Sequence, residues 1–256
     1  MTLITALLLG VVEGITEFLP ISSTGHLILV SELLKLPSTD FHKSFEIIIQ
    51  LGAILSVVAL YFKSFLDIKV LKRLFVAFLP TGIIGLALYK VVKTYLLGSE
   101  AVVLCALLIG GVLIIAFELM HKEAPSEVEP TSAHITYKQS FLIGIFQAIA
   151  IIPGTSRSAA TIIGGLMLGL RRKTIVEFSF LLAVPTMLAA TGLDLVQNAS
   201  SFSMDQFGVL AVGFVTSFVV ALFSIKFLLR YVRNHSFIAF GVYRILLALL
   251  FWFIIL

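Results

Sequence analysis

Long apolar runs, separated by short polar and basic stretches, dominate this chain of 256 residues. A helix that crosses a membrane needs roughly 20 consecutive, mainly apolar residues. Six runs reach about that length, and each is predicted to be a transmembrane helix. They cover residues 44–62, 74–93, 101–120, 176–196, 206–229 and 236–256. The pattern therefore predicts an all-α polytopic membrane protein.

Two further apolar regions, 1–36 and 139–171, are broken in the middle. The first break is Pro20–His26 and the second is Pro153–Ser158. The apolar pieces that flank each break are too short to cross a bilayer comfortably. Irregular backbone at membrane depth is tolerated only where protein buries it or where it lines a wet cavity. Each region is therefore predicted to be a re-entrant helix–loop–helix hairpin, which enters and leaves on the same side.

The two broken regions resemble each other at an offset of 134 positions. Residues 9–14 (LGVVEG) are similar to residues 143–148 (IGIFQA), and the same offset aligns Ser22 with Ser156. Each half then holds one hairpin and three transmembrane helices, and because three is odd the second half must insert upside down. An inverted-topology repeat is predicted within a single membrane domain, 1–256, with repeats 1–120 and 139–256 and a linker at 121–138.

The composition excludes several classes of protein. Hydrophobic residues make up 59% of the chain, charged residues only 12%, and the mean hydropathy is +1.12. A soluble domain of this size cannot hide so much apolar surface. The single cysteine, Cys105, excludes a disulfide framework and a cysteine-based zinc site. Lys and Arg are scattered at segment ends rather than grouped on one face, so no nucleic-acid partner is expected.

Basic residues are distributed unequally between the two sets of loops. Eleven Lys and Arg residues lie in one set, which comprises 63–73, 121–138, 171–173 and 230–235. Four lie in the other set, which comprises 35–43, 90–100 and 197–205. The positive-inside rule assigns the first set to the cytoplasm. Both termini are then expected outside, and the tips of the two hairpins are expected to meet near the middle of the membrane.

Glu13 and Glu17 lie one helical turn apart and point the same way. An acid inside a membrane costs on the order of 2.5–3.5 kcal/mol on insertion scales. Two such acids on one face need a compensating partner: a cation, a shared proton or a buried Arg. The alternative is that both side chains reach the membrane surface or pair with a structural base.

The first break supplies hydroxyl groups beside an imidazole. Ser22, Ser23 and Thr24 follow one another, Gly25 permits close backbone approach, and His26 begins the next helix. Simple N-capping is the alternative role, but a cap needs only one hydroxyl. The group is therefore a candidate for chemistry.

The second break repeats this design around an arginine. Thr155, Ser156, Ser158 and Thr161 surround Arg157. A guanidinium does not lose its charge, so it needs a partner at that depth. Hydroxyls, helix N-terminal amides and an Arg together suit phosphate. The alternative is that Arg157 only neutralises the acidic pair.

Two signatures carry a resemblance to a known family. Residues 13–26 (EGITEFLPISSTGH) and residues 153–161 (PGTSRSAAT) resemble the two signatures of the undecaprenyl pyrophosphate phosphatase family, also called bacitracin-resistance protein A. The similarity extends to Phe45-Glu46 and to Tyr243-Arg244. It implies hydrolysis of undecaprenyl diphosphate to the monophosphate, which recycles the lipid carrier of peptidoglycan synthesis. It also implies bacitracin resistance, a bacterial plasma membrane location, a site open to the outer face and a divalent cation.

The resemblance and the residues together lead to a mechanistic hypothesis. Ser23 attacks the phosphorus with His26 as base, or His26 attacks directly. Glu17 orients or charge-balances His26. Glu13 helps to hold a divalent cation, Mg²⁺ or Ca²⁺, with Glu17, or supports the same network. Six residues are predicted to bind the substrate phosphates: Ser22, Thr24, Ser156, Arg157, Ser158 and Thr161.

Other readings of the sequence stay open. A transporter or lipid flippase is the main rival, because inverted repeats with broken helices are typical of transporters. A lipid phosphatase of the acid-phosphatase-like class is disfavoured, since only its P-S-G-H element has an echo here. Gly10 and Gly14 indicate close helix packing inside the fold more than a homodimer. Arg244, inside the last apolar run, requires a buried partner, for which Asp194 or Glu177 is a candidate.

Overall fold

The computed structural model describes residues 1–37, 39–96, 99–121, 132–198 and 206–255. Every regular element in these ranges is a helix, which confirms the all-α class. The longer helices are α1 (Leu3–Thr16), α2 (Ser23–Leu33), α3 (Asp40–Leu60), α4 (Ile68–Val91), α5 (Glu100–Met120), α6 (Tyr137–Ala148), α7 (Arg157–Met167), α8 (Arg172–Asn198), α9 (Phe207–Tyr231) and α10 (Ile238–Ile255). Four single-turn elements connect them: η1 (Phe62–Leu66), η2 (Val92–Leu96), η3 (Ser132–His134) and η4 (Ile149–Ile151).

Five of these helices, α3, α4, α5, α8 and α9, are long and apolar enough to cross a membrane. They correspond to five of the six predicted spans, and they indicate a multi-pass membrane protein. The sixth predicted span, 236–256, corresponds to α10, whose apolar stretch Ile238–Ile254 is shorter. A sixth crossing therefore stays a prediction.

Both predicted breaks interrupt helices in the structure. In the structure the first break begins earlier than predicted: residues 17–22 separate α1 from α2, and with the first turn of α2 the break covers residues 17–26. The segment that contains η4 and residues 152–156 separates α6 from α7. Insertion of these pairs as re-entrant hairpins stays a prediction. Most of the predicted linker, 122–131, lies outside the described residues.

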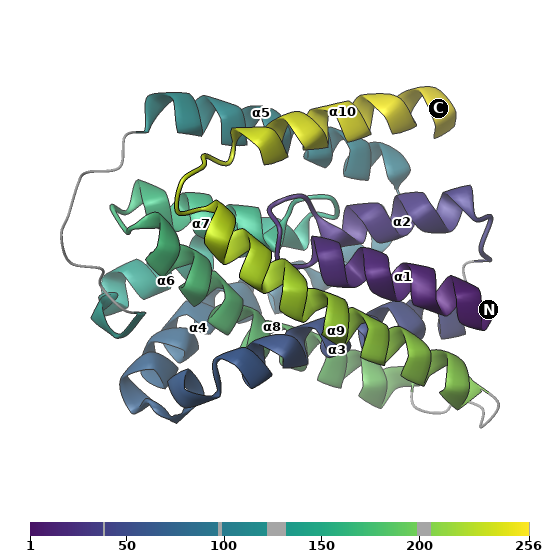
Figure 1. The fold of residues 1–256 in the computed structure, drawn as a ribbon, viewed down its shortest axis with the longest axis horizontal. Helices are drawn as coiled ribbons and strands as arrows, with labels where there is room; N and C mark the ends of the chain where they lie inside the picture. The colour runs from purple at the N-terminus through teal and green to yellow at the C-terminus, as the bar shows by residue number, and fades with distance from the viewer. Residues whose placement is uncertain (38, 97–98, 122–131, 199–205, 256) are drawn as a thin grey trace.

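The helices of the two halves interleave (Figure 1). Helix α1 packs along α9, α6 packs along α4, α3 contacts α8 and α9, and α5 lies beside α10. Glycines allow the first two approaches. A Cβ on Gly10 would collide with the carbonyl of Gly213 on α9, and a Cβ on Gly144 would collide with the carbonyl of Ala77 on α4. The Gly10 and Gly14 faces therefore serve packing within the chain.

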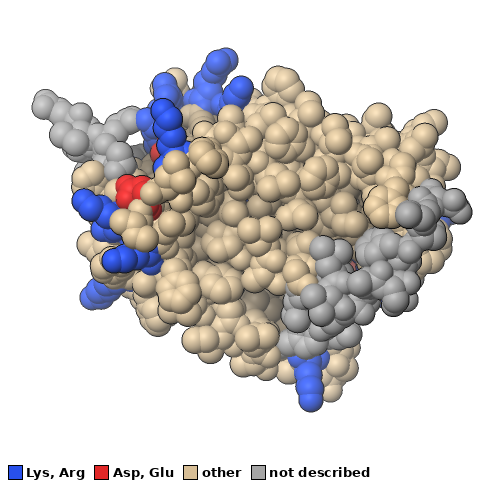
Figure 2. Space-filling model, turned by 90° about the horizontal axis from the view of Figure 1, so that it is seen from below, with Lys and Arg blue, Asp and Glu red and all other residues tan. Residues whose placement is uncertain are grey.

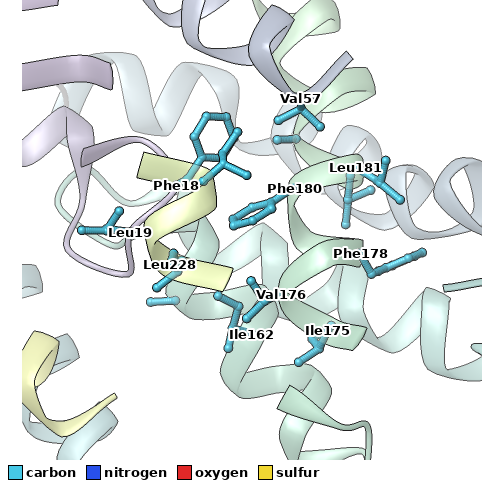
Figure 3. Packing of buried hydrophobic residues seen from close by; sticks show 14 of the residues in the cluster. Phe18, Leu19, Val57, Ile162, Ile175, Val176, Phe178, Phe180, Leu181 and Leu228 are labelled. Atoms are coloured by element: carbon cyan, nitrogen blue, oxygen red, sulfur yellow. The ribbon is translucent and has the colours of Figure 1, made fainter. Parts of the chain in front are cut away.

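The main hydrophobic core includes many side chains of α8 and of the helices around it (Figure 3). Phe178 and Phe180 of α8 are fully buried there, with Ile162 from α7 and Leu228 from α9. Phe18, from the first break, meets Phe180 edge-on with the ring centroids 5.2 Å apart. The first break is thus anchored in the core on its apolar side.

The outer surface carries charge mainly at its ends. Figure 2 shows most of the Lys and Arg side chains of one face gathered at one end, on the left, with few near the opposite end and a broad uncharged belt between. Large apolar side chains such as Ile83, Leu113 and Phe223 are exposed in the long helices. Such a belt matches the lipid-facing surface of a membrane protein. Both chain termini lie at the same end of the molecule (Figure 1).

Candidate active site

The two breaks meet at a cavity of about 170 Å³. It is lined by the first break, by the second break and by the helices α4, α6 and α8. The lining residues are Glu17, Ser22, Ser23, Thr24, Thr81, Gln147, Ala150, Ile151, Thr155, Ser156, Arg157, Thr186 and Met187. Residues about 130 positions apart in sequence therefore share one polar cavity.

An ion pair joins the two breaks. A terminal nitrogen (Nη2) of Arg157 lies 2.9 Å from Glu17 Oε1, and the two side chains are only 12% and 5% exposed. Nη1 of Arg157 donates to the carbonyl oxygen of Ser179 at 2.8 Å. The neutralising role left open for Arg157 is therefore realised with Glu17. Its buried Nε–H has no acceptor within the described part of the chain, which leaves one donor for a ligand.

Ser23 donates its hydroxyl proton to the same carboxylate. Its Oγ lies 2.6 Å from Glu17 Oε2, and the contact is buried. One oxygen of Glu17 thus faces a guanidinium while the other faces a hydroxyl. A short bond to a charged acceptor is among the stronger hydrogen bonds in proteins. This arrangement suits removal of a proton from Ser23.

His26 has partners other than the expected one. Its Nδ1 lies 2.7 Å from the carbonyl oxygen of Ser22, and its Nε2 lies 2.8 Å from the hydroxyl of Tyr243. The hypothesis that His26 is the base for Ser23 requires a hydrogen bond between them, but neither ring nitrogen is bonded to Ser23. Glu17 also contacts Arg157 and Ser23 instead of orienting His26. The sequence spacing was compatible with a Ser23–His26 contact, but the bend of the loop turns the hydroxyl toward Glu17.

The predicted phosphate ligands divide into two groups. Ser22, Thr24 and Ser156 line the cavity. Ser22 and Ser156 also cap α2 and α7, accepting from the amides of Gly25 and Ala159 at 3.3 and 3.2 Å.

Ser158 and Thr161 are fully buried and are not among the lining residues. Ser158 Oγ donates to the carbonyl of Leu19 at 2.9 Å, which ties the second break to the first. Thr161 Oγ1 lies 2.6 Å from Ser179 Oγ. Both hydroxyls bond within the protein and support the loops around Arg157.

Glu13 lies on α1, one helical turn before Glu17, and is 0% exposed. Neither of its carboxylate oxygens finds a hydrogen-bond donor among the described residues. Buried carboxylates without a donor are costly. Carboxylate oxygens are ligands that Mg²⁺ and Ca²⁺ prefer, so the residue fits the predicted cation. No group of three or more His, Cys, Asp or Glu side chains suited to a metal occurs in the described ranges, so a cation here needs oxygens from substrate or water as well.

Arg244 clamps both breaks from α10. It is fully buried, and its guanidinium donates to the carbonyls of Pro20 at 3.4 Å and Gly154 at 3.1 Å. It also donates to the carbonyls of Ala106 and Leu107 on α5. Among the described residues, backbone oxygens therefore take the place of the acidic partner expected from the sequence. Of the two acids named for that role, Asp194 has its side chain outside the described part of the structure.

Comparison with known proteins assigns this chain to a family. The profile of the family described as "Bacitracin resistance protein BacA" matches residues 6–250. The chain belongs to this family.

Curated relatives of this BacA-family chain match over nearly their whole length. The undecaprenyl-diphosphatase of Sulfurihydrogenibium sp. (strain YO3AOP1) is 54% identical over 98% of this chain and 99% of its own. The undecaprenyl-diphosphatase of Aquifex aeolicus (strain VF5) is 50% identical over 96% of each chain. The undecaprenyl-diphosphatase of Wolinella succinogenes is 49% identical over 99% of this chain and 98% of its own. The resemblance predicted from the two signatures is confirmed.

Six residues of the cavity wall lie outside both BacA-family signatures: Thr81, Gln147, Ala150, Ile151, Thr186 and Met187. The Gln147 amide nitrogen donates to the hydroxyls of Thr81 and Thr186 at 2.9 and 3.1 Å. Both hydroxyls donate their protons to backbone carbonyls, so they can only accept from Gln147. The amide oxygen then remains without a partner among the described residues. The repeat offset, which aligns Gln147 with Glu13, was the sequence signal for this residue.

Proposed function

We propose that this chain is an undecaprenyl-diphosphatase, which hydrolyses the lipid diphosphate to undecaprenyl phosphate and inorganic phosphate in a bacterial plasma membrane. The observation that carries the proposal is the Ser23–Glu17–Arg157 array in a cavity formed by both breaks. The names of the full-length relatives support it. The reaction would recycle the lipid carrier of peptidoglycan synthesis, and faster recycling accounts for bacitracin resistance.

Ser23 is the proposed nucleophile and Glu17 the proposed base. Glu17 Oε2 takes the proton of Ser23 while Oγ forms a bond to the terminal phosphorus. The bond between that phosphorus and the bridging oxygen breaks, and undecaprenyl phosphate leaves with the bonding electrons. A water molecule then attacks the phosphoserine, which releases inorganic phosphate and restores Ser23. Direct attack by His26 is disfavoured because both of its ring nitrogens are engaged.

Arg157 stabilises the charge that spreads over the phosphoryl oxygens. Phosphoryl transfer depends mostly on positioning and on electrostatic stabilisation. The Nε–H of Arg157, which is buried and has no acceptor among the described residues, is proposed to donate to a phosphate oxygen when the substrate binds. Ser22, Thr24 and Ser156 line the same cavity and are proposed to bind the diphosphate. Ser158 and Thr161 are proposed to act indirectly, by holding the second break in place.

Glu13, together with Glu17, is proposed to hold a divalent cation, Mg²⁺ or Ca²⁺. The two donor-free oxygens of Glu13 support this assignment. When bound, the cation would neutralise charge on the diphosphate. Without it, Glu13 would remain a buried carboxylate next to the catalytic base, which is unfavourable for the charged form of both.

The membrane arrangement is proposed to be an inverted repeat of 1–120 and 139–256, with α1–α2 and α6–α7 as re-entrant hairpins. Reciprocal packing supports it, because α1 contacts α9 of the second half while α6 contacts α4 of the first. A full count of three spans in each half includes α10. Loop charge favours both termini outside and a cavity that opens to the outer face.

A phosphatase assay in detergent tests this function. The purified chain is given undecaprenyl diphosphate and shorter prenyl diphosphates, with and without a chelator, and released phosphate is measured. We expect release that depends on the cation and that is lost in Ser23→Ala. A lipid flippase gives a different result: no phosphate in detergent, but transbilayer movement of the lipid in sealed vesicles.

A further inference from the structure

The imidazole of His26 sits between two groups that the phosphatase chemistry above does not use. The ring is 7% exposed. On one side Nδ1 lies 2.7 Å from the Ser22 carbonyl oxygen, and on the other Nε2 lies 2.8 Å from the Tyr243 hydroxyl. The planes of the two rings are within 3° of parallel, with centroids 5.6 Å apart. Because the centroids are so far apart, the rings meet through the hydrogen bond rather than face to face.

These contacts require a proton on Nδ1 of His26 and so exclude its Nε2–H tautomer. A carbonyl oxygen can only accept a hydrogen bond, so Nδ1 must carry a proton. The neutral ring then has only a lone pair at Nε2, and this lone pair accepts the proton of Tyr243. Both ring nitrogens are thus saturated in the neutral Nδ1–H tautomer. The proton of Ser23 meanwhile goes to Glu17.

The carbonyl that His26 holds belongs to a strained residue. Ser22 has φ 73° and ψ 94°, in the left-handed half of backbone space that non-glycine residues rarely occupy. Such a conformation persists only where its surroundings hold it firmly. The Ser22 carbonyl receives two donors from His26, the backbone N–H at 3.2 Å and Nδ1–H at 2.7 Å. The next residue in the chain is Ser23.

Side chains of helix α10 therefore hold the first break through hydrogen bonds at two points. Arg244 donates to the carbonyl of Pro20, and the neighbouring Tyr243 reaches the carbonyl of Ser22 through His26. These points lie on either side of Ile21. The two contacts together fix the backbone conformation of the residues that precede Ser23.

We propose that Tyr243 and His26 form a positioning pair that holds Ser22 in its strained conformation and so aims the Ser23 hydroxyl at Glu17. His26 then acts as a neutral donor and transfers no proton to or from substrate. The proposal rests on the proposed role of Ser23 as nucleophile.

Substitutions at His26 separate a positioning donor from a base. His26→Asn keeps an N–H group that can reach the Ser22 carbonyl but has no basic nitrogen, whereas His26→Leu has neither. We expect His26→Leu to lower kcat by about 100-fold, because a small displacement of a reacting atom has that effect. We expect His26→Asn to recover most of that loss, with KM close to wild type in both.

Removal of the tyrosine hydroxyl gives the second measurement. Tyr243→Phe should lower kcat by about 2–10-fold, in line with the loss of one hydrogen bond. Tyr231→Phe is the matched control: it removes a hydroxyl from α9, where the ring stacks on His235 outside the site. That variant should match the wild type in kcat and melting temperature.

Nitrogen-15 NMR of the His26 side chain, assigned by loss of its signal in His26→Asn, provides a readout independent of catalysis. We expect the neutral Nδ1–H tautomer at pH 7 in the wild type and a shifted Nε2 signal in Tyr243→Phe. An imidazolium or an Nε2–H tautomer in the wild type overturns the proposal, even if phosphatase activity is found. Equal inactivity of folded His26→Asn and His26→Leu also overturns it. Failure of the proposed function is distinct, since it appears as absence of phosphate release in the wild type.

Discussion

The two breaks share a backbone plan but carry opposite chemistry. In each, a serine at the same offset, Ser22 or Ser156, caps the following helix through its side chain. The residue after the cap is Ser23 in the first break and Arg157 in the second. The acids of the first region have no counterparts in the second, where the offset finds Gln147 and Ile151 in place of Glu13 and Glu17.

Strain is also placed differently. In the first break the cap residue itself, Ser22, has a positive φ of 73°. In the second break Ser156 has an ordinary φ of −66°, and the positive φ falls on Gly154, which lacks a Cβ and tolerates it. Strained conformations at non-glycine residues concentrate at functional sites. The comparison teaches that a common scaffold holds the nucleophile and base on one side and the positive charge on the other.

The largest effect on catalysis is expected at Ser23, the residue after the cap in the first break. Ser23→Ala should lower kcat by about 10,000-fold or more, because a nucleophile has no substitute. Phosphate release from undecaprenyl diphosphate measures it. Ser56→Ala is the control, since Ser56 is a buried serine whose hydroxyl donates to the Ala53 carbonyl within α3. Near-normal phosphate release by Ser23→Ala would show that Ser23 is not the nucleophile. The residue after the cap in the first break would then not supply the attacking group.

The second-largest effect is expected at Arg157, which follows the cap residue in the second break as Ser23 does in the first. Arg157→Lys should lower kcat by about 100–1,000-fold, the range for loss of one preorganised donor, since an ammonium cannot reproduce the planar fork. Steady-state kinetics with the same substrate measure this loss. The comparison variant is Arg172→Lys, which alters a second buried pair, with Glu118, outside the cavity.

Arg172→Lys should lower the melting temperature, because a poorly paired buried charge is destabilising. It should leave the kcat of the folded protein intact. Equal loss of kcat in both variants would mean that Arg157 serves structure alone.

A smaller effect is expected where the offset pairs Glu13 with Gln147. Glu13→Gln makes the two regions alike at this position and removes a proposed cation ligand. We expect the apparent affinity for Mg²⁺ or Ca²⁺ to fall by about 10–100-fold, as for other groups that support a metal site. Activity should then need a higher concentration of the cation. Activity is measured across a titration of each cation after chelation. A titration curve identical to the wild-type curve would assign Glu13 a different partner.

The smallest effect concerns packing beneath the two regions. Gly10→Ala and Gly144→Ala both push a methyl group into the backbone of the facing helix, α9 or α4. Each should reduce stability by about 1–3 kcal/mol, as overpacked cores do. Gly192→Ala, where a Cβ meets no atom within 4 Å, is the control. Thermal unfolding in detergent measures all three, and a loss in only one of the first two would show that the two interfaces are not equivalent.

Much of this architecture was predictable because it depends on local pattern. Five predicted spans overlap long helices, with the largest mismatch at α4, which begins at Ile68 and not at 74. Both breaks fall where Pro, Gly and hydroxyl residues interrupt the apolar runs. The residue types that line the cavity were largely predicted too, since Glu17 and Arg157 are rare and costly in an apolar segment, and hydroxyl residues gather at both breaks. Thr81 and Thr186 were not predicted, because single threonines in long apolar helices carry no signal of what they face.

The amino-acid sequence by itself determined that this is a helical membrane protein with two interrupted regions, one acidic and one basic. Hydrophobicity and helix propensity act along neighbouring residues, so they can be read from order alone. Only the tertiary structure decided the partners: Ser23 with Glu17, His26 with Tyr243, and Arg244 with backbone carbonyls. Hydrogen bonds depend on direction over about 3 Å, and no spacing rule specifies how a loop turns a hydroxyl toward one neighbour rather than another.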